Sequence, residues 1–70
     1  MAKFPAVHKK IEVVGTSAKS FADAAQNAVA RASKSVRGLE WFEVVELRGR
    51  VDGSTIAEYQ VSMKIGFKLE

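Results

Sequence analysis

The chain of 70 residues contains no cysteine, one histidine, one proline and one tryptophan. Without cysteine no disulfide can form, and the usual cysteine–histidine zinc sites are excluded. Catalytic sets that need a cysteine–histidine pair or two histidines are excluded as well. No apolar run approaches the ~20 residues of a membrane span, and no apolar segment of a signal peptide is visible. We therefore expect a cytoplasmic protein with no metal centre and no membrane partner.

The small size of the chain limits how it can be stabilised. We expect a single domain over 1–70, and a chain of this length buries only about 60% of the surface that its unfolded form exposes. Since disulfides and metals are excluded, association with other copies is the remaining source of stability. A hydrophobic fraction of 47% can provide the interface, so we expect a homo-oligomer. The net charge of +3 is mildly basic and favours anionic partners.

The hydrophobic pattern predicts one helix and three strands. Alternation of apolar and polar residues predicts strands over 7–14, 39–50 and 56–69. Apolar residues at helical spacing, together with many alanines, predict a helix over 21–37. The predicted fold class is α+β, in the order β-α-β-β. The second and third strands form an antiparallel hairpin, and the helix packs on the apolar face of a three-stranded antiparallel sheet.

Capping and turn residues predict where these elements begin and end. Ser20 is the candidate N-cap of the helix, with Asp23 three positions later as in a capping box. Gly38 is the candidate C′ glycine, where the left-handed conformation favours glycine. Asp52-Gly53 is typical of the tight turn in a hairpin.

The strand 39–50 is unusual because both of its faces carry large apolar residues. The apolar face of the strand 56–69 is the natural surface for the helix. Residues of that face include Tyr59, Val61, Met63, Ile65 and Phe67. We expect Phe42 and Val44 to join this face, and Trp41 to point to the opposite face with Gln60 and Lys64.

The titratable residues do not form a catalytic set in the sequence. His8 has no carboxylate or nucleophile in its sequence neighbourhood and is interpreted as an exposed strand residue. Glu40, Glu43 and Glu46 could act as acid–base groups, but nearby cations favour ion pairing. A bulge near 44–45 would decide which face the last two of these glutamates take. We expect no enzymatic activity.

Trp41 with Gln60 and the cations on the same face is a pattern that suits a planar, anionic heterocycle. An indole provides a surface for stacking, and a glutamine offers both a hydrogen-bond donor and an acceptor. Lysine and arginine are the usual phosphate partners. The candidates here are Arg48, Arg50, Lys64 and Lys68.

Six short motifs occur along the chain in a fixed order. They are Glu12-Val13-Val14-Gly15-Thr16-Ser17, Ala28-Val29-Ala30-Arg31-Ala32, Trp41-Phe42-Glu43-Val44, Arg48-Gly49, Tyr59-Gln60-Val61 and Gly66-Phe67. With these motifs, nearly the entire chain resembles the dodecins, small flavin-binding proteins of bacteria and archaea. The resemblance implies a β-α-β-β subunit whose sheet wraps around one helix, and a hollow dodecamer of such subunits.

The same resemblance implies a ligand and its site. In dodecins, pairs of flavins stack between tryptophans from different subunits, and the matching residue is Trp41. A glutamine that matches Gln60 binds the flavin's pyrimidine edge. Arg48 matches an arginine common in bacterial members, and Lys68 stands where they often have arginine. The implied ligand is FMN, or riboflavin or FAD, and the implied function is flavin storage, buffering and photoprotection without catalysis.

Three alternative functions remain beside flavin storage. The first is a carrier of coenzyme A or another nucleotide, which some bacterial dodecins bind and which Arg31, Lys34 and Arg37 on the outer side of the helix would favour. The second, a nucleic-acid-binding module, is disfavoured because the polar face of the strand 56–69 carries no aromatic residue. The third, a flavin reductase, is disfavoured because no residue offers a nicotinamide site.

Overall fold

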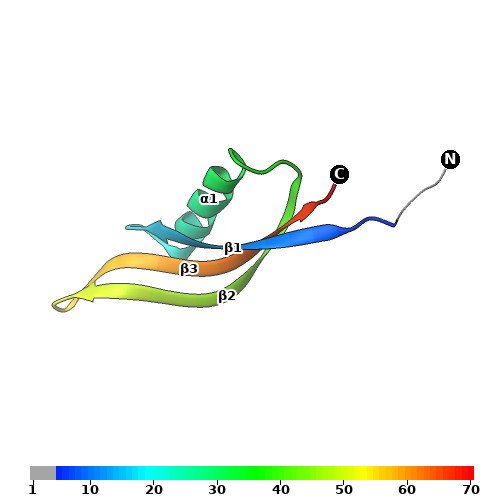
Figure 1. The fold of residues 1–70 in the computed structure, drawn as a ribbon. Helices are drawn as coiled ribbons and strands as arrows, with labels where there is room; N and C mark the ends of the chain where they lie inside the picture. Colours follow the sequence, from blue (N-terminus) through cyan, green and yellow to red (C-terminus); the bar gives the residue numbers. More distant parts are fainter. Residues whose placement is uncertain (1–4) are drawn as a thin grey trace.

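The computed structural model of the protein describes residues 5–70. Its elements are β1 (His8–Ser17), α1 (Phe21–Ala32), β2 (Leu39–Asp52) and β3 (Thr55–Lys68). The strands pair antiparallel in the order β1-β3-β2, so β1 lies beside β3 of the β2–β3 hairpin. α1 lies on one face of the sheet (Figure 1). The predicted α+β class and the β-α-β-β order are confirmed.

The corner between β1 and α1 is fixed by hydroxyl groups and by a glycine. Ser20 is the N-cap of α1, and its Oγ accepts a hydrogen bond from the Asp23 N–H at 3.0 Å, as predicted. The Asp23 carboxylate instead accepts from the buried Ser17 hydroxyl at 2.7 Å. A Cβ at Gly15 would collide with the Ala24 carbonyl oxygen, so the helix can approach β1 only because glycine stands there.

The predicted end of the helix at residue 37 is wrong, because α1 ends at Ala32. The Ser33 hydroxyl donates to the Ala30 carbonyl at 2.7 Å, and the N–H groups of Lys34 and Ser35 bond carbonyls three residues back. Serine side chains that compete for backbone carbonyls weaken a helical ladder, and here the chain continues as turns. Gly38 does have a positive φ of 75°, but it lies in the loop before β2 and is not the C′ residue.

The pairing register settles which side chains share a face. Three register irregularities lie in β2, and one of them, between Val44 and Glu46, is the bulge considered from the sequence. Because the bulge takes up Val45, Glu43 pairs with Lys64 and Glu46 with Ser62, which places both glutamates on the face away from α1. Trp41 pairs with Gly66 and also lies on this outer face.

The core is small and lies between α1, β1 and β3. Three alanines of α1 pack on three fully buried β3 side chains: Ala24, Ala28, Ala32, Val61, Met63 and Ile65. α1 packs against β1 and β3. On the helix side of β2, Leu39 packs partly against this core, whereas Phe42, Val44 and Leu47 stay exposed. Phe42 is 49% exposed and Leu47 is 54% exposed. One chain therefore leaves an apolar row on β2 uncovered.

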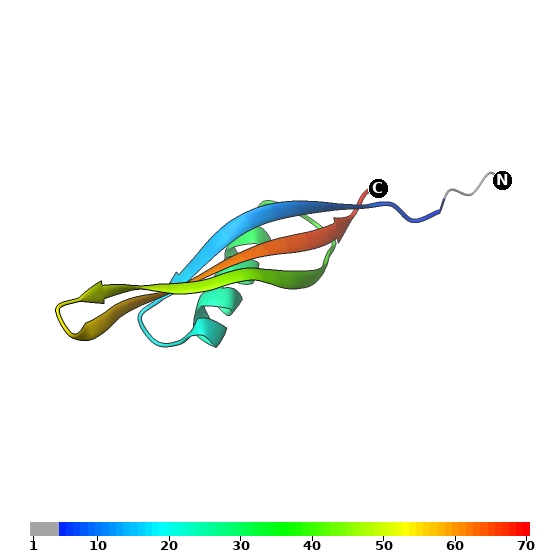
Figure 2. The ribbon, with the colours of Figure 1, turned by 90° about the horizontal axis from the view of Figure 1, so that it is seen from below.

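The subunit is elongated, with extents of 62 × 20 × 14 Å. Its radius of gyration is 15.1 Å, whereas a compact chain of this length has about 11 Å. Its accessible surface is 5259 Å², against roughly 4,300 Å² for a compact monomer of this mass. The tip of the β2–β3 hairpin extends beyond the helix in both views (Figures 1 and 2). Among residues 5–70 no helix has the length and apolar character of a membrane span.

Candidate ligand-binding site

Gly66 creates a gap on the outer face of the sheet, and the indole of Trp41 lies in it. A Cβ at position 66 would collide with three carbons of the six-membered indole ring, so the ring lies directly over the glycine. Side chains of β1 and β2 are separated by β3, about 10 Å from strand to strand across it. Because β3 has no side chain at Gly66, groups from both flanking strands meet above it.

Two side-chain contacts between β1 and β2 lie beside the indole. His8 Nε2 lies 2.8 Å from Glu40 Oε1, and Lys10 Nζ donates to Glu43 Oε1 at 2.8 Å. The other Glu43 oxygen accepts from the Trp41 indole N–H at 3.4 Å. The His8 and Trp41 rings are tilted by 59° with centroids 5.1 Å apart. Trp41 is therefore held on several sides, yet 39% of it is exposed.

The Glu43 carboxylate binds both Lys10 and the Trp41 indole N–H. The Lys10 hydrogen bond lowers the pKa of Glu43 below its ordinary value, while partial desolvation opposes the shift. The Trp41 N–H and the charge of Lys64 lower the pKa further. Glu43 and Glu46 thus form ion pairs, with Lys10 and Arg48, as expected from the sequence, whereas Glu40 contacts His8. Glu43 stays ionised and holds the indole N–H.

Gln60 and Arg48 form a second polar group on the same face. Arg48 Nε donates to Gln60 Oε1 at 2.7 Å, and Gln60 Nε2 donates to Glu58 Oε1 at 2.8 Å. Glu46 lies 3.8 Å from an Arg48 Nη, and the guanidinium remains largely exposed. The amide and the guanidinium are thus presented together.

The two groups lie far apart along the outer face, with Trp41 near the C-terminal end of β3 and Gln60 near its middle. Gly66, below Trp41, is six positions along β3 from Gln60, which corresponds to roughly 20 Å. Lys68 is exposed and pairs with His8, so it lies at the Trp41 end. The predicted site residues share one face, as expected, but a single three-ring ligand cannot contact Trp41 and Gln60 of the same chain.

Sequence reasoning missed the contribution of β1 and of Gly66 to this site. His8 does lie on a strand, but its partner Glu40 is 32 positions away in the sequence. That contact depends on β1 pairing with β3 and not with β2, which the alternation pattern does not specify. The Gly66-Phe67 motif carried the relevant signal, since a glycine inside a strand often marks a close approach of another group.

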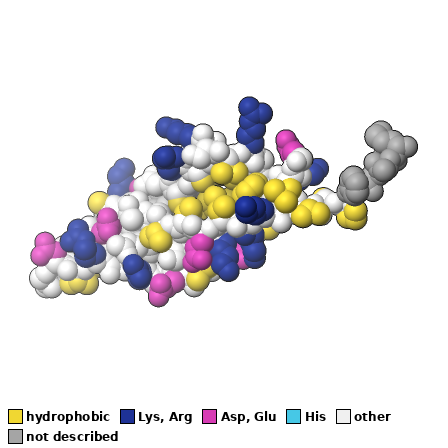
Figure 3. All heavy atoms as spheres, viewed as in Figure 1, with side chains coloured by type: hydrophobic (Ala, Val, Ile, Leu, Met, Phe, Trp, Pro, Cys, Tyr) yellow, Lys and Arg dark blue, Asp and Glu magenta, His cyan; other side chains and the backbone are white. Residues whose placement is uncertain are grey.

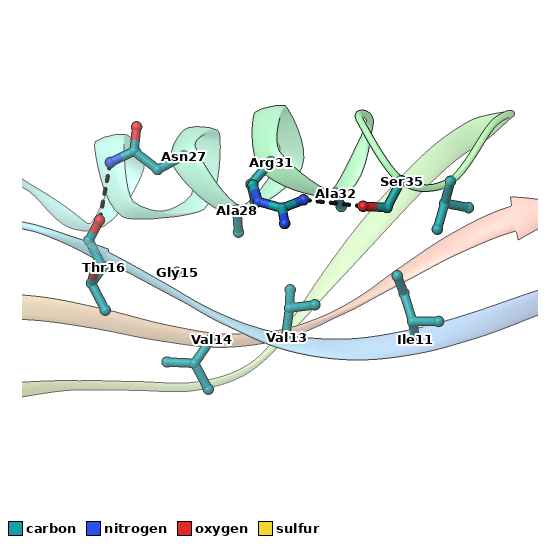
Figure 4. A pocket seen from close by; sticks show the side chains of 11 residues that line it. Ile11, Val13, Val14, Gly15, Thr16, Asn27, Ala28, Arg31, Ala32 and Ser35 are labelled. Atoms are coloured by element: carbon teal, nitrogen blue, oxygen red, sulfur yellow. Dashed lines mark hydrogen bonds between the residues drawn. The ribbon is translucent and has the colours of Figure 1, made fainter.

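A separate cavity of about 500 Å³ lies between β1 and α1. Figure 4 shows Ile11 and Val13 pointing from β1 toward the helix, and Arg31 lying along α1 toward Ser35, to which it donates at 3.0 Å. In the space-filling view, hydrophobic side chains gather below the helix while Lys and Arg lie along its outer side (Figure 3). Lys34 and Arg37 do not line the cavity. Within residues 5–70 no group of three His, Asp or Glu side chains could hold a metal ion.

These features define a class of protein: a small β-α-β-β subunit with a partly exposed tryptophan on the sheet face away from α1 and an uncovered apolar row on the helix side of β2. A family model described as Dodecin matches residues 7–70. The chain belongs to the dodecin family. Dodecins are small binding proteins.

Similarity extends over nearly the full length of individual dodecins. A Thermus thermophilus protein named dodecin is 50% identical over 64 residues, which cover 91% of this chain and 93% of that protein. A crystal structure of a Thermus thermophilus protein has a TM-score of 0.91 at 48% identity, covering 94% of this chain and 97% of the other. Calcium dodecin of Mycobacterium tuberculosis, a calcium-chelating antigen, has a TM-score of 0.80 at 34% identity, covering 91% of each chain.

Proposed function

We propose that this dodecin binds flavins between subunits of a homododecamer, and that it stores and buffers them and suppresses their photochemistry without catalysing a reaction. The observation that carries the proposal is the indole of Trp41, held over Gly66 by Glu43 yet open to a partner on the outer face. An aromatic surface held in one orientation favours stacking, because little conformational freedom is lost on binding.

The separation within one chain favours a site between chains. Trp41 and Gln60 lie roughly 20 Å apart along β3, so a ligand that contacts both kinds of residue must lie where copies meet. The uncovered apolar row of β2 and the elongated shape give the subunit the surface for such an assembly. Membership of the dodecin family also favours an oligomer.

The residues of the outer face fit a flavin chemically. The Trp41 indole stacks on the ring system, and the Gln60 amide bonds its pyrimidine edge. The indole donates an electron to an excited flavin in face contact and takes it back, which returns the flavin to its ground state. Arg48, with exposed guanidinium nitrogens, and Lys68 are the partners for the phosphate of FMN or FAD. Lysine provides charge there without the bidentate geometry of arginine.

Flavin fluorescence tests this proposal directly. Riboflavin, FMN and FAD are titrated into the apoprotein, and we expect saturable quenching of flavin emission. Trp41→Ala should abolish quenching, and Trp41→Phe should retain binding but quench less, because a phenyl ring is a poorer electron donor. Phosphate recognition by Arg48 predicts that Arg48→Ala weakens FMN binding more than riboflavin binding. Unchanged quenching in Trp41→Ala would refute the proposal.

A second candidate function, coenzyme A or nucleotide carriage, is favoured by the cavity between β1 and α1. Its apolar lining residues and the guanidinium of Arg31, which also lines it, suit a ligand with an apolar and an anionic part. Equilibrium dialysis with coenzyme A checks this function. Arg31→Ala should weaken binding, whereas Lys34→Ala, which removes an equal charge outside the cavity, should not. Equal effects of the two variants would leave only general electrostatic attraction.

A further inference from the structure

The single histidine of the chain packs against its single tryptophan. His8 reaches the indole because Gly66 leaves room above β3, and the imidazole Nε2 lies 2.8 Å from Glu40 Oε1. The imidazole thus contacts both a carboxylate and an aromatic ring, and each of these groups interacts more favourably with the protonated than with the neutral ring.

The charges around His8 come from all three strands. Lys10 lies two positions after His8 along β1, and Lys68 on β3 is the residue paired with His8. Glu40 and Glu43 approach from β2, the first in direct contact and the second bound to Lys10. Two acids and two bases therefore face this histidine, and the group in direct contact with it is an acid.

We propose that His8 is a positioning residue for Trp41, and that protonation of His8 fastens the indole over Gly66 and so tunes ligand capture with pH. Histidine side chains change charge between about pH 5 and 8. Toward the acid end of that range the imidazolium forms a charged pair with Glu40 and a cation–π contact with the indole. An exposed contact of this kind corresponds to about two- to fivefold in an equilibrium constant. The effect on ligand capture rests on the proposed function, whereas the effect on the indole does not.

Intrinsic fluorescence of the apoprotein isolates the effect on the indole. Trp41 is the only tryptophan and His8 the only histidine, so a change in Trp41 emission between about pH 5 and 7 reports this pair. We expect emission to fall as the pH falls, because an imidazolium accepts an electron from the excited indole better than a neutral ring. His8→Gln should abolish the transition. Lys9→Gln, on the other face of β1, is the matched control and should leave the transition in place.

Riboflavin, which carries no phosphate, isolates the effect on ligand capture. We expect its dissociation constant to be about two- to fivefold lower at pH 5.5 than at pH 8 in the wild type, and equal at the two pH values in His8→Gln. A flat fluorescence titration, or a transition that persists in His8→Gln, would overturn the inference whether or not flavin binds. A fluorescence transition without any change in riboflavin affinity would overturn the tuning of ligand capture. Complete absence of flavin binding would refute the proposed function and leave the fluorescence test valid.

Discussion

The candidate site depends on one missing side chain. At Gly66 the central strand presents only backbone, and this allows Trp41 from β2 and His8 from β1 to meet above β3. A tryptophan on an exposed strand face ordinarily samples several rotamers. Here the backbone of Gly66 and the Glu43 carboxylate select one orientation.

Gly66→Ala tests this dependence. The added methyl group would occupy the space of the indole ring, so the ring must move off the sheet. We expect Trp41 emission to shift toward that of a solvated indole, and unfolding free energy to fall by about 1–3 kcal/mol, as for overpacking. Ser62→Ala, on the same face of β3, is the control and should leave the emission unchanged. An unchanged emission spectrum in Gly66→Ala would contradict the described position of the indole.

Low pH should weaken the contacts that hold Trp41, because Glu43 becomes protonated. The Lys10 hydrogen bond lowers the pKa of Glu43, so its contribution to stability is complete above the ordinary glutamate range, near about pH 4.3, and is lost as pH falls through the lowered value. Denaturant unfolding followed between pH 6 and 3 should therefore show a smaller loss of stability in Glu43→Gln than in the wild type. Identical pH profiles for the two proteins would show that the pair contributes nothing.

The helix and the strands could be predicted from the sequence, whereas contacts between them could not. Local pattern predicted α1, its N-cap Ser20 and the three strands, because periodicity and capping are written in neighbouring residues. The helix end was missed because serines after Ala32 favour turns, which the apolar spacing up to position 36 concealed. The face of Trp41 was predicted correctly, whereas its contact with His8 was not, because strand order is a long-range property.

Gly15→Ala tests the close approach of α1 to β1. The new Cβ would collide with the Ala24 carbonyl oxygen and lie 2.9 Å from the Ala28 Cβ. Backbone atoms cannot turn aside as a flexible side chain does, so the helix must shift away from the sheet. We expect the free energy of unfolding to fall by about 1–3 kcal/mol, measured by urea denaturation. Val14→Ala, at the neighbouring exposed position, should change it by about 0.5 kcal/mol or less.

The subunit as a whole is poorly suited to exist alone. Its core contains few large side chains, its surface exceeds that of a compact monomer, and the apolar row of β2 is bare. From the sequence, the small size of the chain alone predicted that it associates with other copies. Composition could not show where the interface lies, because that follows from α1 covering β1 and β3 but not β2.

A charge placed in the uncovered row should separate the subunits. Leu47→Asp replaces an exposed apolar side chain of β2, so little is lost within one chain, but an aspartate buried between copies would be unpaired. We expect sedimentation velocity to show smaller species than in the wild type. Leu47→Val, which keeps the surface apolar, should preserve the assembly. An intact assembly in Leu47→Asp would place the interface elsewhere.

Native mass spectrometry of the purified protein tests the central claim most directly, because it reports subunit number and bound ligand together. With riboflavin or FMN added, we predict a twelve-chain mass that carries additional flavin masses, and the same twelve-chain mass without flavin in Trp41→Ala. A flavin-bound monomer, or a twelve-chain assembly that retains its flavin in Trp41→Ala, would contradict a site built around Trp41 between subunits.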